Sequence, residues 1–519
     1  MNIKILYKIF PFFITFVIIY IFYGTGIHSD EITEIDYIIK NKLDWFDYIK
    51  IIPQAYAGTV YFRLFEYYLF YWPYLLSEVG IYFIDALKII FFIISVSFVS
   101  IFLKDYIDKK FAILFALLFY FYPSHDSSVF WYELIGYNTF ACSLLMLSHS
   151  LIRANKFLIG IPLSFFSGFF SYSTLPYIFG LSIIFLYEKK FYKFFLYILI
   201  GILYLFYYLY LSYYIFPTET KISSGLGISS FLGNLILNLV SSIDALVGIS
   251  FFYKIYLSIM NISFLSLILS IILTFFMYFF FKDLKISKNK NLIKIFLCFI
   301  TIYLVSILMY SLTGQYFQTP FNLGNRVTIY GSLLGSLIFI ILFRKNILIF
   351  LLIFNLYLFG ISDHWKNWNN QQNKIFSIIE NNKDLKKIDS NNILIIKGNL
   401  YSKLGSMNHI EFFIQPWLVE TIFKKYTETN YLFILSDHLK YKNNEIIDIK
   451  YSKKIPITKK IYLYDSNSDL LSELTIHELI KIINSYKKDK RHIIQIINID
   501  FINKIIIKLN PRLEYIFSS

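Results

Sequence analysis

Charged residues are scarce in this chain. Only 16% of the 519 residues are Asp, Glu, Lys or Arg, whereas a soluble protein carries about 25%. Hydrophobic residues make up 57% of the sequence, and the mean hydropathy is +0.57. Apolar runs of about 20 residues, long enough to span a bilayer, recur through positions 1–361. We therefore expect an α-helical polytopic membrane protein rather than a soluble globular one.

Cysteine and acidic residues are also few. Cys142 and Cys298 both lie inside apolar runs, so they predict neither a disulfide framework nor a metal site. The chain has 34 Asp and Glu against 49 Lys and Arg, a formal net charge of +15. Nucleic-acid binding is disfavoured because no groove-reading motif accompanies this charge. In a membrane protein such cations gather in cytoplasmic loops.

The basic residues predict the topology. They form six groups, at Lys4 and Lys8 and at 104–110, 153–156, 188–193, 282–290 and 344–346. Placing all six in the cytoplasm leaves two crossings between each consecutive pair and one after the last group, or about eleven transmembrane helices. The expected helices lie near 5–23, 84–103, 111–122, 137–152, 157–171, 175–187, 194–215, 260–281, 293–312, 326–343 and 347–361. The N-terminus is then cytoplasmic, and the last helix ends outside, in the periplasm if the membrane is a bacterial inner (cytoplasmic) membrane.

Two domains follow from this pattern. Residues 1–361 form a multi-pass transmembrane domain, and residues 362–519 form a soluble extracytoplasmic domain. In the latter, the β-rich runs "NILIIKG", "YLFILS", "KIYLYD" and "IIQIINI" alternate with helical stretches, which predicts an α/β or α+β fold. The segment 244–281 fits either one long helix or a helix plus an interfacial piece.

The loop at 24–83, directly after the first predicted helix, holds an unusual group of acids. "HSDEITEID" at 28–36 begins with Asp30 and Glu31. Acids are inexpensive at a membrane boundary, so the group could be purely structural. Alternatively, a carboxylate at the edge of a low-dielectric slab is suited to act as a general base. We expect Asp30 or Glu31 to be catalytic and prefer Asp30, because its shorter side chain is held more rigidly.

The rest of this loop mixes aromatic residues with single charges. Such a composition is typical of a helix lying in the membrane interface. A spanning helix at 61–77 is the alternative, but Arg63 and Glu66 would make it costly.

Two later external turns carry further polar residues. "FYFYPSHDSSVFWYELIGYN" at 119–138 contains His125, Asp126 and Asn138, which we expect to contact substrate. "LGNRV" places Arg326 at the start of a predicted spanning helix, where it is either an interface anchor or a phosphate ligand, as Arg63 could be. A metal site formed by His28, Asp30 and His125 is conceivable, but no spacing supports it.

These groups, in this order, resemble the integral-membrane glycosyltransferases of the GT-C superfamily, which include protein O-mannosyltransferases and lipid A aminoarabinose transferases. "HSDE" stands where the family has its acidic base, and "YFRLFEYYLF" places Arg63 before the second helix. "YPSHDSSVF" is similar to the family's next external turn at Pro123, His125 and Asp126, and "LGNRV" to its late arginine turn. "FFSYSTLP" at 169–176 lacks the Lys and Glu found there in several members.

The resemblance implies sugar transfer from a polyprenyl-phosphate donor to a glycan, lipid or protein acceptor on the outer face of the lipid bilayer. Arg63 or Arg326 would hold the donor phosphate, and Asp30 would activate the acceptor. No cofactor is required, although a divalent metal remains possible.

Three other readings stay open. One is a lipid-linked glycan flippase or transporter, but the charges collect at the external rim and not in mid-membrane. Another is an O-antigen polymerase or ligase, and the last is a membrane anchor for the C-terminal domain. Trp365 and Trp368 of that domain could stack on sugars, but we expect them to mark the membrane interface.

Overall fold

The computed structural model describes residues 3–55, 57–63, 65–66, 73–75, 82–217, 227–284, 290–313, 317–457 and 459–486, with residues 504 and 508. The chain divides into two compact units. The first contains Met1–Gly26 and Lys42–Trp365, and the second contains Ile27–Asn41 and Lys366–Arg491. A single boundary at residue 361 therefore does not describe the division, because Ile27–Asn41 groups with the C-terminal residues.

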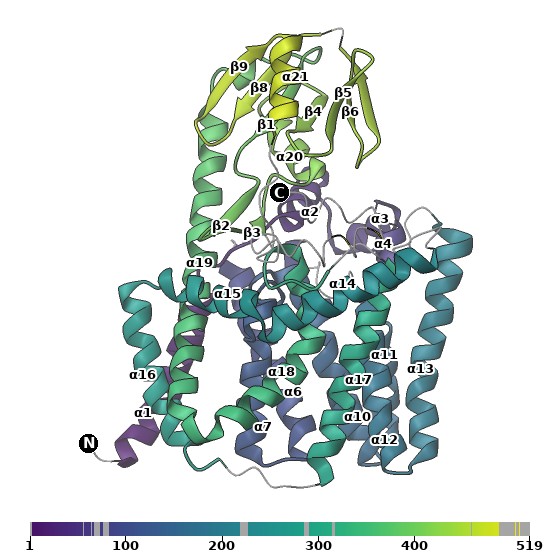
Figure 1. The fold of residues 1–519 in the computed structure, drawn as a ribbon, viewed down its shortest axis with the longest axis vertical. Coiled ribbons are helices and arrows are strands. Elements are labelled where there is room, and N and C mark those ends of the chain that lie inside the picture. Colours follow the sequence, from purple (N-terminus) through teal and green to yellow (C-terminus); the bar gives the residue numbers. More distant parts are fainter. Residues whose placement is uncertain are drawn as a thin grey trace. The chain divides into compact units, whose positions relative to one another are not determined.

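The first unit is helical (Figure 1). Its helices are α1 Ile3–Phe22, α3 Trp45–Ala55, α4 Ala57–Phe62, α6 Tyr82–Lys104, α7 Lys109–Tyr120, α8 Ser127–Phe130, α9 Tyr132–Ile135, α10 Ala141–Arg153, α11 Phe157–Gly168, α12 Leu175–Tyr187, α13 Phe191–Tyr210, α14 Ile228–Val247, α15 Ile249–Met260, α16 Phe264–Phe281, α17 Lys290–Thr313 and α18 Ile329–Phe343. A further helix, α19 Ile347–Asn381, begins in this unit, and its residues from Lys366 onward belong to the second.

Each predicted apolar segment contains a helix. Among the described residues, seven helical stretches are long and apolar enough to cross a membrane, or up to eight if the bent pair α11 and α12 forms one span. The apolar part of α1, Pro11–Phe22, is shorter than these. The chain is therefore a polytopic membrane protein, whereas the number of eleven crossings stays a prediction.

Several basic groups meet at one end of the helices around Glu188. Its carboxylate lies 2.6 Å from Lys190 Nζ, 3.0 Å from Lys294 Nζ and 3.4 Å from an Arg153 guanidinium nitrogen. Burial opposes ionisation, but the hydrogen bonds from Lys190 and Lys294 outweigh it and lower the pKa of Glu188 to about 2. One charged acid thus holds three positive side chains from separate segments together.

Helices α14 and α15 run across the end of the upright helices in Figure 1. Ile228–Met260 is long and apolar enough to span a membrane. In α14, however, the apolar side chains are mostly exposed and polar side chains are buried, the reverse of a helix in a soluble protein. Apart from Ser229 in its first turn, the exposed residues of α14 are apolar: Ile228, Leu232, Ile236, Leu239, Val240, Ile243 and Val247.

The buried side of α14 is polar and bonds to α17. Asn234 Nδ2 donates to the Ser311 carbonyl at 3.2 Å, and the Ser242 and Tyr303 hydroxyls are 2.7 Å apart. The exposed apolar side of α14 is therefore suited to face lipid, while polar side chains on its other side form hydrogen bonds within the protein. Since α15 and α16 are separate helices, one long helix over 244–281 is ruled out, whereas the interfacial position of the first piece stays a prediction.

The predicted interfacial loop contains two short helices in the first unit. α4 ends at Phe62, and residues 73–75 form a separate 3₁₀ turn. A continuous helix over 61–77 is therefore ruled out at its start, while residues 67–72 and 76–81 lie outside the described part.

The second unit combines α2 with a mixed α/β region. Its helices are α2 Asp30–Asn41, the end of α19, α20 Pro416–Phe423 and α21 Ile476–Ser485. Its strands are β1 Ile393–Lys397, β2 Tyr401–Leu404, β3 Met407–Glu411, β4 Tyr431–Ile434, β5 Leu439–Lys442, β6 Glu445–Asp448, β7 Lys453–Pro456, β8 Ile461–Asp465 and β9 Leu470–Leu474.

One four-stranded sheet in the order β4-β1-β8-β9 forms the centre of this unit. β1 is parallel to β4 and β8, and β9 is antiparallel to β8. β1, β4 and β8 coincide with three predicted strands, while the fourth, "IIQIINI", lies outside the described residues. Buried residues of β1 and α21, including Ile393, Ile395, Leu479 and Ile483, belong to one hydrophobic cluster.

The arrangement of the basic end predicts a labelling pattern. Both native cysteines are buried, so new surface thiols can be tested one at a time. Ala154→Cys lies beside the Glu188 cluster, and Gly227→Cys begins α14, near the opposite end of α17. With the basic end cytoplasmic, we expect an impermeant maleimide to label Gly227→Cys in sealed right-side-out vesicles.

In the same vesicles, Ala154→Cys should react only after permeabilisation. The native chain serves as the blank. Labelling of Ala154→Cys in sealed vesicles, with Gly227→Cys protected, would show that the topology is the reverse of the predicted one.

Candidate functional site

The chain leaves α1 through a turn fixed by a buried ion pair. Gly24 and Gly26 have φ of 84° and 66°, which glycine adopts without steric cost. The Asp85 carboxylate accepts hydrogen bonds from the amides of Gly24 at 2.8 Å and Gly26 at 3.1 Å. Lys88 Nζ lies 3.1 Å from Asp85 and 2.9 Å from the Thr25 hydroxyl. The end of α1 is thus anchored to α6.

In the second unit, the two predicted catalytic acids have different environments. The Glu31 side chain is fully buried, and its Oε2 accepts the His28 amide at 2.7 Å. It therefore caps the start of α2 as a structural acceptor. Asp30 is half-buried, and its Oδ1 accepts the indole N–H of Trp417 at 2.6 Å. Of the two acids, Asp30 is the one whose side chain is partly exposed to solvent.

Trp365 and Trp368 do not have the exposed positions that we expected for residues at the membrane interface. Trp365, in the first unit, is completely buried, and Trp368, in the second, is 8% exposed and packs edge-on against Phe412. Neither is an interface anchor or an open sugar platform. Trp417, which the sequence reading passed over, is 42% exposed and bonds to Asp30.

In the first unit, Arg63 is positioned by the end of α4. The Tyr204 hydroxyl donates to the Phe62 carbonyl at 2.8 Å, and the Tyr207 hydroxyl donates to the Tyr61 carbonyl at 2.9 Å. Both tyrosines come from α13. Two hydrogen bonds therefore hold the backbone just before Arg63 against a predicted spanning helix.

Arg63 belongs to a buried charged cluster. Its guanidinium lies 3.1 Å from Glu66 and 3.5 Å from Glu133. Burial raises the pKa of Glu66 to about 8, with Arg63 and Arg326 opposing this shift and Glu133 adding to it. Near pH 7 Glu66 is therefore mostly neutral. The cluster then has two guanidinium charges against one carboxylate, so it can attract an anion.

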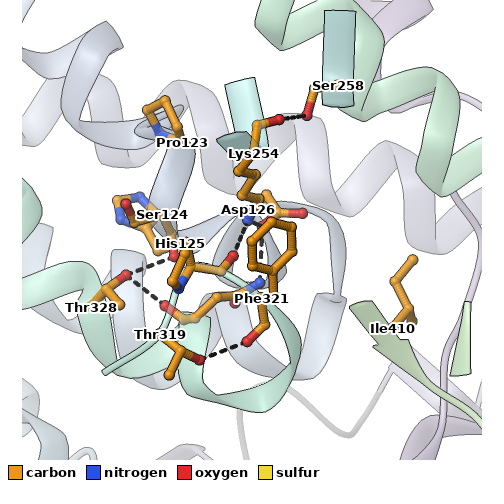
Figure 2. A network of polar contacts seen from close by, with 12 residues as sticks. Pro123, Ser124, His125, Asp126, Lys254, Ser258, Thr319, Phe321, Thr328 and Ile410 are labelled. Atoms are coloured by element: carbon orange, nitrogen blue, oxygen red, sulfur yellow. Dashed lines mark hydrogen bonds and ion pairs between the residues drawn. The ribbon is translucent and has the colours of Figure 1, made fainter. Parts of the chain in front are cut away.

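A second buried network, drawn in Figure 2, positions the turn that carries Arg326. Lys254 Nζ donates to the Asp126 carboxylate and to the Pro320 carbonyl. Asp126 also accepts from Asn325 Nδ2 at 2.9 Å and from Trp365 Nε1 at 2.7 Å. Lys254 and Asp126 are both almost completely buried. Asp126 thereby ties α15 and α19 to the residue directly before Arg326.

His125 and Asn138 also have partners within the protein. The ring nitrogens of His125 lie 2.8 Å from Ser332 Oγ and 3.1 Å from the Tyr120 carbonyl oxygen. Burial lowers the pKa of His125 to about 4, so the ring is neutral near pH 7. Asn138 Nδ2 donates to Ser128 Oγ at 2.8 Å. This geometry favours a positioning role for His125, Asp126 and Asn138 over the predicted substrate contacts.

Sequence reasoning thus found part of the charged cluster. The structure places Arg63 against Glu66, and Arg326 is close enough to lower the pKa of the same carboxyl group. The sequence reading treated Glu66 only as an obstacle to a spanning helix. The spacing in "RLFE", with Arg and Glu three residues apart, was the available signal.

The metal alternative gains no support from the described residues. No group of three or more His, Cys, Asp and Glu side chains is arranged there to hold a metal ion. His28 and Asp30 belong to the second unit, whereas His125 belongs to the first.

Comparisons with known proteins give no relative for this chain. No family model, no curated protein and no solved structure matches it. A function must therefore be argued from the chain's own residues.

The buried Lys254 and Asp126 pair predicts a strong stability effect. Lys254→Met should leave the Asp126 carboxylate buried without its cation and lower the free energy of unfolding by about 3–5 kcal/mol. The measurement is thermal unfolding of the purified chain in detergent.

A double variant tests the coupling. Asp126→Asn together with Lys254→Met should cost less than the sum of the two single changes, because the pair acts as a unit. The exposed Lys345→Met is the matched control and should leave the melting temperature unchanged. Additive costs would show that the pair does not interact.

Proposed function

We propose that the chain is a membrane glycosyltransferase of the GT-C type, which moves a sugar from a polyprenyl-phosphate donor to a glycan, lipid or protein acceptor. The observation that carries this proposal is the contrast between the two acids that begin α2. Glu31 is buried and caps the helix, while Asp30 is accessible beside an exposed tryptophan. An accessible carboxylate beside an aromatic ring suits a base that acts on a saccharide hydroxyl.

The proposed reaction needs one base. An acceptor hydroxyl oxygen attacks the anomeric carbon of the donor sugar and forms the new glycosidic bond. The bond from that carbon to the phosphate oxygen breaks, and the phosphate leaves with the electron pair. Asp30 takes the hydroxyl proton, and its negative charge favours the positive character that develops at the anomeric carbon.

The charged cluster of the first unit is assigned to the donor phosphate. Two guanidinium groups, of Arg63 and Arg326, bind phosphate oxygens well and remain charged beside lipid. Glu66 and Glu133 lie close to Arg63, Arg326 acts on the pKa of Glu66, and the two acids set the net charge of the cluster. A lipid tail in the bilayer adds affinity remote from the reacting carbon and holds the donor in place.

We place the protein in a bacterial inner membrane, with its N-terminus in the cytoplasm and the second unit in the periplasm. This orientation rests on the positive-inside rule. The cluster of three basic side chains around Glu188 at one end of the helices is consistent with it.

Replacing the acids of α2 separately tests the base. We expect Asp30→Asn to reduce sugar transfer from a polyprenyl-phosphate donor by at least ~100-fold, the range for loss of a general base. Glu31→Gln should keep most activity, because an amide oxygen still accepts the His28 amide. The measurement is transfer in membranes at matched expression.

Asp36→Asn, on the same helix, is the control. Asp36 pairs with the exposed Lys40 and Lys425, and such ion pairs contribute little to stability, so its loss should affect neither chemistry nor folding strongly. Full transfer by Asp30→Asn would remove Asp30 from the mechanism. No transfer by the native chain from any donor tried would favour a flippase.

The protonation of Glu66 predicts pH-dependent donor binding. Below about pH 8 Glu66 is neutral, and the cluster carries one net positive charge. Above that pH its carboxylate forms and cancels this charge, so the affinity for the phosphodiester should fall by up to about tenfold per pH unit. The measurement is the Kd of a polyprenyl-phosphate sugar between pH 6 and 10, without acceptor.

Variants separate Glu66 from its neighbour. Glu66→Gln should bind the donor equally well across this range, whereas Glu133→Gln should keep a pH dependence. An unchanged slope in Glu66→Gln would contradict the assignment, because another group would then be titrating.

A further inference from the structure

One exposed tryptophan in the second unit is held in a fixed orientation. Trp417 is the second residue of α20, after Pro416 at the first position, where proline favours the start of a helix. Its side chain is 42% exposed. The indole N–H is nevertheless bonded to Asp30 Oδ1 at 2.6 Å. The polar edge of the ring is thus occupied by protein, and much of its apolar surface remains open.

A second aromatic ring stands at right angles to the first. The centroids of Trp417 and Tyr451 are 6.1 Å apart, with an interplanar angle of 85°. The Tyr451 hydroxyl donates to Gln415 Oε1 at 3.0 Å, and Gln415 Nε2 donates to Glu411 Oε2 at 3.3 Å. The two rings form a corner, which we call the aromatic corner, with both polar groups fixed by hydrogen bonds.

The charge around the aromatic corner is mainly negative. Burial raises the pKa of Tyr451, and the carboxylates of Glu411, Asp448 and Asp30 raise it further. Lys450 Nζ lies 4.8 Å from the Tyr451 ring centroid as a nearby cation. Three carboxylates against one ammonium disfavour an anionic ligand by like-charge repulsion.

We propose that the aromatic corner of Trp417 and Tyr451 binds a pyranose ring of the acceptor, and that this acceptor saccharide is neutral or amine-bearing rather than acidic. This inference rests on the proposed glycosyl transfer and names the acceptor class for it. The C–H face of a pyranose stacks on the open indole surface, and its hydroxyls meet Asp30 and Gln415. The hydroxyl nearest Asp30 is the one that loses its proton.

The fixed geometry favours this occupant over a lipid contact. Tryptophans that anchor to a membrane face headgroups through the indole N–H, but here that group is bonded to a carboxylate of the same unit. A ring held in this way contributes stacking with little loss of side-chain freedom on binding.

Direct binding tests the aromatic corner without any reaction. The full chain is purified in a detergent without sugar headgroups and titrated with maltotriose, glucosamine trimer and trigalacturonate as probes. We expect saturable binding of one or both of the first two and weaker binding of trigalacturonate. Trp417→Ala should lower the affinity for the probe about fivefold to tenfold, and Trp417→Phe, which keeps an aromatic ring, should lower it by less.

Trp45→Ala is the matched control, because Trp45 in the first unit is similarly exposed, at 45%. It should leave the affinity unchanged. Melting temperatures equal to that of the native chain exclude misfolding of the variants. Binding of none of the probes, equal affinity in Trp417→Ala, or preference for trigalacturonate would each overturn the proposal.

Transfer assays separate this inference from the proposed function. If Trp417→Ala loses saccharide binding while Asp30→Asn keeps full transfer, the aromatic corner is supported as a saccharide site and Asp30 is rejected as the base. Transfer lost in Asp30→Asn, together with saccharide binding unaffected by Trp417→Ala, would keep the enzyme and reject the aromatic corner.

Discussion

A buried ammonium and carboxylate, Lys254 and Asp126, hold together segments that are far apart in sequence. Lys254 comes from α15, and Asp126 comes from the turn after α7. Asp126 also accepts from Asn325 and from Trp365 of α19. Removing these charges from water is costly, and only close pairing with added hydrogen bonds compensates for it. The turn bearing Arg326 therefore depends on a pair that does not contact substrate in the proposed reaction.

The cluster of Arg63, Glu66 and Glu133 balances charge differently. There, one carboxyl group becomes neutral, which lowers the cost of burying it beside another acid. Together with Arg326, the result is a group of side chains that carries one net positive charge and loses it when Glu66 releases its proton. Such a group tolerates burial without a ligand and still offers guanidinium groups to an anion.

Local patterns predicted much of the fold. Apolar runs predicted helices at each proposed span, and alternating β-rich runs predicted β1, β4 and β8, because burial sets both periodicities. The assignment of Ile27–Asn41 to the second unit was not predictable. It depends on contacts such as that between Asp30 and Trp417, which are 387 residues apart. No local pattern records a pairing at that distance.

The candidate site was predictable to a smaller extent, for the same reason. Arg63, Arg326 and Asp30 were noticed because charge is rare in this chain. His125 and Asp126 were noticed on the same ground, yet their partners Ser332 and Lys254 make them part of the framework. Scarcity of charge shows that a residue matters but not whether it serves stability or chemistry. Only its partners decide that.

The buried polar side of α14 constrains the order in which the protein is assembled. Its inner polar residues Asn234 and Ser242 pair with Ser311 and Tyr303 of α17, which is synthesised later. Until α17 enters the membrane, Asn234 and Ser242 lack these two hydrogen bonds, so the helix gains less by inserting deeply. We therefore expect α14 to take its final place against the other helices only after α17 has been synthesised.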